Sequence, residues 1–371
     1  MRILYVSRQF NRSGYHILRH LLQSERFKLA TVIVPPVSTS QKCIGWLNRP
    51  LLAPIEQARY RAAVRYYRGQ HLRFEGSIPR LARTWDIPVL ELPTLRSESA
   101  LRSCRELDID LIVLGGGWPE LISPSVLELP PLGAINTHPS LLPEFRGTDI
   151  HRWQILAGID TSGVTIHYMD ARFDTGGILG QAKVALTGDE TPQDLFEMTA
   201  RASGPLMLDV LDRISSSRPD RAPSLTQPHR TDARRYHSKW PWDDPTFMTI
   251  DWRAPASQIE RLVRASAQES YRYLGPTFSV DGDRFILRRA SKVPSDRPLQ
   301  TGELDNGDDG AVSVGTGDPN MALRLDAVQE FSSVPNLHRS HPGRWLAARL
   351  GARNSTRYLD LAGEDDDAEQ P

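Results

Sequence analysis

Asn136, His138 and Asp174 are the residues whose types and spacing could stabilise an oxyanion and move a proton. Asn136 and His138 lie two positions apart at the end of an apolar run, so extended backbone would place their side chains on one side. A carboxamide can donate a hydrogen bond to a developing oxyanion, and an imidazole exchanges protons near neutral pH. Asp174 could orient that imidazole or accept a proton through water.

Each of these residues also has a structural interpretation. A single Asn or His in a loop is more often structural than catalytic, and the stretch Asp174–Gly177 (DTGG) is first of all a turn sequence. The functional interpretation therefore depends on the elements that would bring the three side chains together.

Short apolar runs predict those elements. Arg2–Val6, Leu29–Val34 and Leu111–Leu114 are predicted strands, and a helix is expected over Tyr15–Gln23. Strand, helix and strand in this order indicate an α/β fold with a parallel sheet and right-handed crossovers. Ligands of such sheets bind beyond the carboxyl ends of the strands, so the turns that follow the strands are the expected site.

The region around the three polar residues contains two long motifs. NTHPSLLPEFRG begins at Asn136, FDTGGILGQAKV begins at Phe173, and the predicted strand SGVTIHYMD separates them. These motifs resemble the signatures of the 10-formyltetrahydrofolate-dependent formyltransferases, which include the glycinamide ribonucleotide, methionyl-tRNA and amino-sugar N-formyltransferases. The resemblance implies a Rossmann-like formyltransferase catalytic domain with a parallel-rich sheet over residues 1–214.

The resemblance also implies a mechanism. Asn136 and His138 would bind the formyl oxygen and stabilise the tetrahedral intermediate that forms when an amine attacks the formyl carbon. Asp174 would orient His138 and relay the amine proton through water. The co-substrate would be 10-formyltetrahydrofolate, with no metal and no covalent enzyme intermediate.

The resemblance implies that the folate contacts the segments Trp118–Ser123 and Met169–Phe173, with Leu142 and Pro143 as an apolar wall. The expected residues are Trp118, Leu121, Ile122, Ser123, Leu142, Pro143, Met169, Asp170, Ala171, Arg172 and Phe173. Trp118 could stack on the pterin or fill core. Arg172 departs from the small residue common in methionyl-tRNA enzymes, which leaves the contacts of its loop open.

The rest of the chain is predicted to form a second domain. Residues 215–249 begin with a Ser-, Pro- and Arg-rich stretch and are expected to be a linker. Residues 250–335 contain short strand-like runs separated by turn sequences, which predict a small β-barrel-like C-terminal domain. Its start is similar to the C-terminal module of methionyl-tRNA formyltransferase. The tail, residues 336–371, ends in an acidic stretch that is expected to be disordered.

Composition limits the classes of function and location. Lys plus Arg and Asp plus Glu each number 45 in 371 residues, so no net charge attracts nucleic acid, although a neutral total can contain a basic patch. Cys43 and Cys104 form neither a disulfide framework nor a zinc motif. The sequence has no signal peptide and no apolar run of the ~20 residues that a membrane span needs. A cytoplasmic protein that does not bind membranes is expected, and the oligomeric state is not predicted.

The acceptor has several candidates. An arginine-rich insertion, residues 38–83, is either a solvated helix or a surface that binds phosphates. The basic loop by which methionyl-tRNA enzymes enter the acceptor stem is absent, because PPVSTSQK holds a single lysine. A small-molecule amine, either a nucleotide-linked amino sugar or an amino-acid-like metabolite, is therefore favoured over tRNA. Two functions of another class stay open, a formyltetrahydrofolate hydrolase and a non-catalytic folate-binding protein.

Overall fold

The computed structural model describes residues 1–36, 76–118, 120–227, 236–267, 275–295, 297–307, 310–331, 340–350 and 357–359. Most of the predicted arginine-rich insertion and the end of the predicted tail lie outside these residues. The chain forms two compact units. The first consists of residues 1–150, 160–187 and 193–238, and the second of residues 151–159, 188–192 and 239–371.

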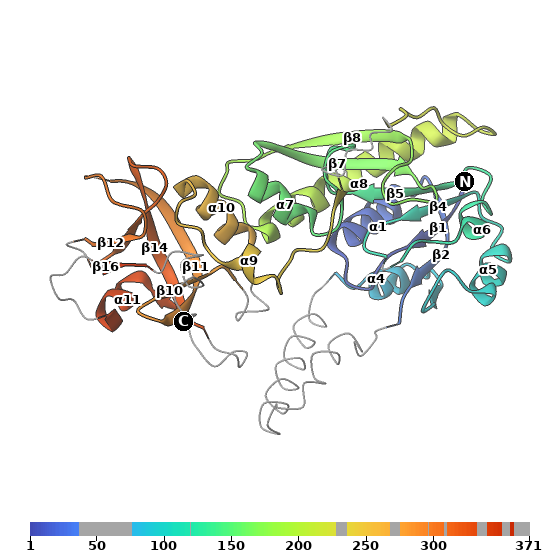
Figure 1. The fold of residues 1–371 in the computed structure, drawn as a ribbon. Helices are drawn as coiled ribbons and strands as arrows, with labels where there is room; N and C mark the ends of the chain where they lie inside the picture. Colours follow the sequence, from blue (N-terminus) through green and yellow to red (C-terminus); the bar gives the residue numbers. More distant parts are fainter. Residues whose placement is uncertain are drawn as a thin grey trace, which may run out of the picture. The chain divides into compact units, whose positions relative to one another are not determined.

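A seven-stranded sheet forms the centre of the first unit (Figure 1), with the order β3-β2-β1-β4-β5-β7-β8. Its strands are β1 (Arg2–Val6), β2 (Lys28–Val34), β3 (Val89–Glu91), β4 (Leu111–Leu114), β5 (Ala134–His138), β7 (Thr161–Tyr168) and β8 (Ile178–Ala185). The first five strands of this order pair in parallel, and β7 and β8 add antiparallel pairs at one side. The predicted parallel-rich α/β sheet is thereby confirmed.

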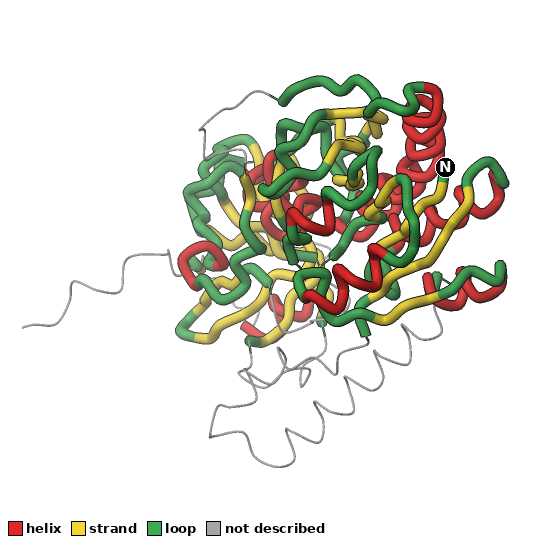
Figure 2. Tube along the Cα trace, turned by 90° about the vertical axis from the view of Figure 1, so that its right-hand side faces the viewer, coloured by secondary structure: helices red, strands yellow, loops and turns green. Residues whose placement is uncertain are grey.

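Alternation along the strands sends apolar side chains to both faces of the sheet. Ile3 and Tyr5 belong to one buried cluster with side chains of three helices, α1 (Arg12–Ser24), α4 (Ile78–Thr84) and α8 (Pro192–Ser216). Leu4 and Val6 belong to a second cluster with α5 (Glu98–Arg105) and α6 (Pro124–Leu127). Helices therefore cover both faces (Figure 2), as expected for parallel strands that are apolar throughout.

The junction of β1 and α1 is tightly packed at the carboxyl end of β1. Asn11 caps α1 by accepting a hydrogen bond from the Gly14 amide. The buried Tyr5 hydroxyl donates to the Gly14 carbonyl at 2.6 Å, and a Cβ atom at Gly14 would lie 2.3 Å from Ser7 Oγ. This packing fixes the loop, residues 7–11, that borders the sheet edge where ligands are expected.

The second unit contains a curled antiparallel sheet with the order β10-β11-β14-β13-β12-β16. Its strands are β10 (Thr277–Val280), β11 (Asp283–Pro294), β12 (Glu303–Asn306), β13 (Val312–Gly315), β14 (Met321–Glu330) and β16 (Arg357–Tyr358), and β15 (His341–Pro342) pairs with β14. The helices of this unit are α7 (Ile150–Ala157), α9 (Pro245–Met248), α10 (Ala256–Ala265) and α11 (Gly343–Leu350). The first residue of α7, Ile150, belongs to the first unit. The fully buried Trp252 packs edge-on against Phe278 in the core of the second unit. The predicted β-rich C-terminal fold is confirmed.

Within the described residues, no helix combines the length and the hydropathy required to cross a membrane.

Candidate active site

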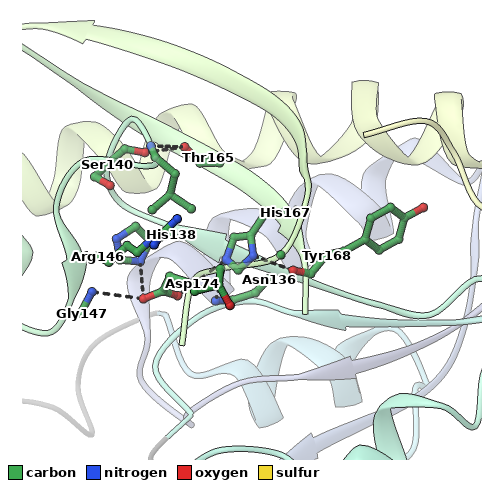
Figure 3. A network of polar contacts seen from close by, with 12 residues as sticks. Asn136, His138, Ser140, Arg146, Gly147, Thr165, His167, Tyr168 and Asp174 are labelled. Atoms are coloured by element: carbon green, nitrogen blue, oxygen red, sulfur yellow. Dashed lines mark hydrogen bonds and ion pairs between the residues drawn. The ribbon is translucent and has the colours of Figure 1, made fainter. Parts of the chain in front are cut away.

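The structure brings the three predicted polar residues together (Figure 3). Asn136 and His138 lie at the carboxyl end of β5, one on either side of Thr137, and Asp174 lies in the turn between β7 and β8. Strand β7 pairs antiparallel with β5, and the loop that follows β7 brings Asp174 back to His138 at the carboxyl end of β5. The site therefore lies at the strand ends, where the sequence pattern placed it.

His138 is buried and has both ring nitrogens directed at protein atoms. Its Nε2 atom lies 2.7 Å from the Phe145 carbonyl oxygen. Because a carbonyl can only accept, Nε2 carries the proton of the neutral ring. Its Nδ1 atom lies 3.5 Å from Asp174 Oδ2. A proton that arrives at Nδ1 would therefore lie between the imidazole and the carboxylate.

His167 is a fourth member of the site that the sequence analysis missed. It lies on β7 as the direct pairing partner of Asn136, with Nε2 3.4 Å from Asn136 Nδ2 and 3.7 Å from Asp174 Oδ1. Its Nδ1 atom donates to the Tyr168 carbonyl at 2.7 Å, so Nε2 of the neutral ring is an acceptor for the Asn136 amide. The available signal was a single ionisable residue inside the apolar run VTIHYM.

Asp174 lies between the two histidines in a strained turn. Its backbone has a φ of 55°, in the left-handed region, and its Oδ2 atom accepts the Gly147 amide at 3.2 Å. Burial alone would raise the pKa of the Asp174 carboxyl, but the nearby His138 and His167 rings and the Gly147 amide lower this pKa well below its usual range. Asp174 is therefore an anion at neutral pH.

Burial lowers the pKa of His138 below its ordinary value of 6.5. The neighbouring Asp174 carboxylate and the Phe145 carbonyl act in the opposite direction, and the charges of His167 and Arg146 lower the pKa further. His138 is consequently neutral at pH 7 in this structure and has a proton-accepting Nδ1 beside an anion.

Asn136 presents hydrogen-bonding capacity that the protein leaves unused. Its Oδ1 atom is buried and has no hydrogen-bond partner among the described residues. With one amide hydrogen directed at His167, the second amide hydrogen and Oδ1 can bind a ligand. The free N–H of Asn136 can donate to a carbonyl oxygen, and its Oδ1 can accept from an amine that attacks the same carbonyl carbon.

A second polar network fixes the turn that follows β5. The Thr165 hydroxyl donates to the Ser140 carbonyl at 2.6 Å and accepts the Leu142 amide at 3.0 Å. Gln181 on β8 donates to the Leu142 carbonyl at 2.9 Å. These bonds secure the backbone that leads to Phe145, whose carbonyl orients His138.

The first predicted folate segment follows β4. Trp118 is partly buried against the cluster formed with α5 and α6, and its Nε1 atom is buried with no hydrogen-bond partner in the described chain. Ile122 is buried, Leu121 is 36% exposed, and the Ser123 hydroxyl donates to the Leu95 carbonyl. Trp118 therefore contributes to core packing and also retains a free indole N–H.

The second predicted folate segment is the loop after β7. The Met169 amide donates to the Ala134 carbonyl, and Phe173 is 48% exposed. The Asp170 carboxylate accepts the Thr175 hydroxyl and the Arg172 amide, which orders the loop without using the Arg172 side chain.

The remaining predicted folate positions border these segments. Leu142 is buried and Pro143 half-buried, whereas Ala171 is exposed. The described residues contain no group of three or more His, Cys, Asp or Glu side chains placed to hold a metal ion.

Comparison with known proteins identifies the family. The sequence model of the Formyl transferase family matches residues 75–211, and that of the Formyl transferase C-terminal domain matches residues 244–333. The methionyl-tRNA formyltransferase of Symbiobacterium thermophilum is 30% identical over 273 residues, which cover 70% of this chain and 79% of that protein. This chain belongs to the formyl transferase family. It is accordingly an N-formyltransferase, and the fold and enzyme class predicted from the two motifs are confirmed.

Solved structures support the fold of this formyltransferase. An N-formyltransferase from Helicobacter canadensis, solved with folinic acid and dTDP-3-aminofucose, has a TM-score of 0.58 at 16% identity and covers 88% of this chain and 99% of that one. HypX from Aquifex aeolicus, solved with tetrahydrofolic acid, has a TM-score of 0.52 at 15% identity and covers 96% of this chain. This chain spans about half the length of HypX, 50% of that chain.

Proposed function

We propose that this formyltransferase transfers the formyl group of 10-formyltetrahydrofolate to the primary amine of a small acceptor. The acceptor is a nucleotide-linked amino sugar or an amino-acid-like metabolite. The observation that carries the chemistry is the buried Asn136 carboxamide, with unused donor and acceptor groups next to the His138 and Asp174 pair.

In the proposed reaction, the acceptor nitrogen attacks the formyl carbon, and the bond from that carbon to folate N10 then breaks. Asn136 donates to the oxyanion of the tetrahedral intermediate and accepts an N–H of the attacking amine. The amine loses one proton and N10 gains one, so no net proton is released. His138 and Asp174, whose facing atoms lie 3.5 Å apart, hold that proton between the two steps.

The folate is proposed to lie against the segments around Trp118–Ser123 and Met169–Phe173, with Leu142 and Pro143 as apolar wall. The buried, unpartnered Nε1 of Trp118 supports this placement, because a polar heterocycle would satisfy a donor that otherwise costs free energy.

Arg8 supports an acceptor that carries an anionic group. It follows β1, is exposed, and has no ion pair within the part of the chain that the structure describes. A Cβ atom at Gly117 would lie 3.5 Å from Arg8 Cδ, and one at Gly116 would lie 3.7 Å from the Thr137 carbonyl oxygen between Asn136 and His138. Arg8 is thus near the reacting centre, at the strand ends, and a guanidinium there suits the phosphate or carboxylate of either proposed acceptor.

A second candidate is methionyl-tRNA formyltransferase. Its support is that the Symbiobacterium thermophilum relative, which shares 30% identity with this chain, is a methionyl-tRNA formyltransferase. Against it stand the single lysine in PPVSTSQK and the equal numbers of acidic and basic residues. A formyltetrahydrofolate hydrolase would use water in place of the amine at the same polar groups.

The proposed function is tested with 10-formyltetrahydrofolate that carries a 13C-formyl label. The enzyme is offered nucleotide-linked amino sugars, amino acids and charged initiator tRNA in separate reactions, and products are analysed by mass spectrometry. Label in one of the small amines is expected. Label in methionyl-tRNA alone would establish the second candidate, and labelled formate in every reaction would establish the hydrolase.

A further inference from the structure

The segment that connects the two family-model matches packs against the catalytic turn. It lies between residue 211, where the first match ends, and residue 244, where the second begins. Residues 212–227 and 236–243 of this segment are described, and those up to residue 238 belong to the first unit. Its composition predicts a linker, yet Gln227 within it is only 3% exposed.

Gln227 hydrogen-bonds to two backbone carbonyls of the turn that contains Asp174. Its Nε2 atom donates to the Asp174 carbonyl at 3.1 Å and to the Gly176 carbonyl at 2.7 Å. Its Oε1 atom accepts Arg146 Nη2 at 2.6 Å. The carboxamide thus uses both of its amide hydrogens on the turn and its oxygen on the first residue of β6 (Arg146–Gly147).

The neighbouring backbone leaves the turn little freedom to move away from the segment. Leu225 and Ile178 exchange two backbone hydrogen bonds of 2.8 Å, which adds a bridge to the start of β8. A Cβ atom at Gly177 would lie 2.3 Å from Ser224 Oγ. The residues after Asp174 are therefore held by the connecting segment on one side.

The same segment also supports the group that binds the Asp174 carboxylate. Strand β9 (Tyr236–His237) pairs in parallel with β6, and a Cβ atom at Gly147 would lie 2.0 Å from the His237 carbonyl oxygen. The Gly147 amide in turn donates to Asp174 Oδ2. The connecting segment thus contacts the backbone of Asp174 through Gln227 and its carboxylate through β6.

We propose that Gln227 is a positioning residue that holds Asp174 at its working distance from His138. This inference rests on the proposed function. Asp174 has a left-handed backbone, which costs free energy and persists only where the surroundings fix it. The two bonds from the Gln227 side chain to the carbonyls of residues 174 and 176 supply that constraint.

The test uses two substitutions of similar size in the full-length chain. Gln227→Met removes all three hydrogen bonds, and Gln227→Glu keeps an acceptor for Arg146 but removes both donors to the turn. Leu225→Ala is the matched control, because the Leu225 side chain is 73% exposed and its bridge uses backbone atoms only. We expect kcat to fall about tenfold or more in both Gln227 variants with each KM within about twofold, since small misplacements of a reacting group reduce turnover. Leu225→Ala should match the wild type.

A titration separates positioning from general loss of structure and does not require turnover. The Asp174 carboxylate raises the pKa of His138, so release of the turn in Gln227→Met should move the NMR titration of His138 to lower pH while circular dichroism stays unchanged. Normal kcat in both variants, or an unchanged His138 titration in folded Gln227→Met, would overturn the inference. If the wild type transfers no formyl group, the proposed function fails, and the titration alone decides whether Gln227 positions Asp174.

Discussion

His138 Nδ1 faces Asp174 Oδ2 across 3.5 Å, while the opposite nitrogen of the same ring donates to the Phe145 carbonyl. This arrangement leaves the neutral ring with its lone pair directed at an anion. A proton can enter that gap and bind both groups, so the pair is built to take up a proton during a reaction and to release it afterwards.

Removal of Asn136, which donates to the oxyanion, or of His138, which holds the proton, should reduce turnover more than substrate binding. We expect Asn136→Ala and His138→Ala to lower kcat by on the order of a hundredfold or more, with little change in folate affinity. Steady-state kinetics and a folate-binding titration measure the two effects. Asn320→Ala, at an exposed position of the second unit, is the control. Near-normal turnover in either variant would remove that residue from the mechanism.

The electrostatics of the pair predict a direction for the His138 pKa. Burial lowers it below 6.5, and the Asp174 carboxylate opposes that change. In Asp174→Asn the opposing charge is lost, so His138 should titrate at still lower pH than in the wild type. NMR of the ring protons across the acid range measures both values. A His138 pKa that rises in Asp174→Asn would mean that another group controls the ring.

His167 should affect turnover by orienting the Asn136 side chain. Loss of its acceptor nitrogen frees the Asn136 amide to rotate, and one hydrogen bond is worth about 1 kcal/mol, or roughly a fivefold change in rate. We expect His167→Leu to lower kcat by about fivefold or more and His167→Gln, which retains a side-chain acceptor, to lower it less. Kinetics of both variants at saturating substrates decide this. Equal losses in the two variants would assign His167 to packing.

How far the site could be predicted depends on the kind of signal each residue leaves in the sequence. Asn136, His138 and Asp174 belong to contiguous motifs, and β1 and β4 coincide with short apolar runs. His167 could not be placed because its role follows from the antiparallel pairing of β5 with β7, and an apolar run does not encode the direction or register of its neighbour. Gln227 lies in a stretch without periodicity, where composition predicts only a connection.

Arg8 provides a test of the acceptor class. A charge-assisted hydrogen bond contributes roughly 1.5 to 3 kcal/mol, so Arg8→Met should raise the KM for an anionic acceptor by about tenfold to a hundredfold and leave the KM for folate unchanged. Arg19→Met, at an exposed arginine of α1, is the matched control. Equal KM values for Arg8→Met and Arg19→Met would remove Arg8 from acceptor binding.

Salt dependence distinguishes a small acceptor from tRNA. Each phosphate contact adds about one unit to the slope of log affinity against log salt. We expect a shallow slope for the acceptor, and we expect charge reversal at Arg65 and Arg68 in the arginine-rich insertion to change the KM for one small substrate or to have no effect. A steep slope with initiator tRNA, lost in the double reversal, would establish tRNA as the acceptor.

The most direct test of formyl transfer is the balance of products in a single turnover. Excess enzyme is mixed with 10-formyltetrahydrofolate, with and without the amine acceptor identified by labelling, and tetrahydrofolate, formate and formylated amine are quantified. We predict tetrahydrofolate and formylated amine in equal amounts, only when the acceptor is present, and formation of both products on the order of a hundredfold more slowly with His138→Ala. Tetrahydrofolate matched by free formate without an acceptor, or an equal rate of product formation with His138→Ala, would contradict this prediction.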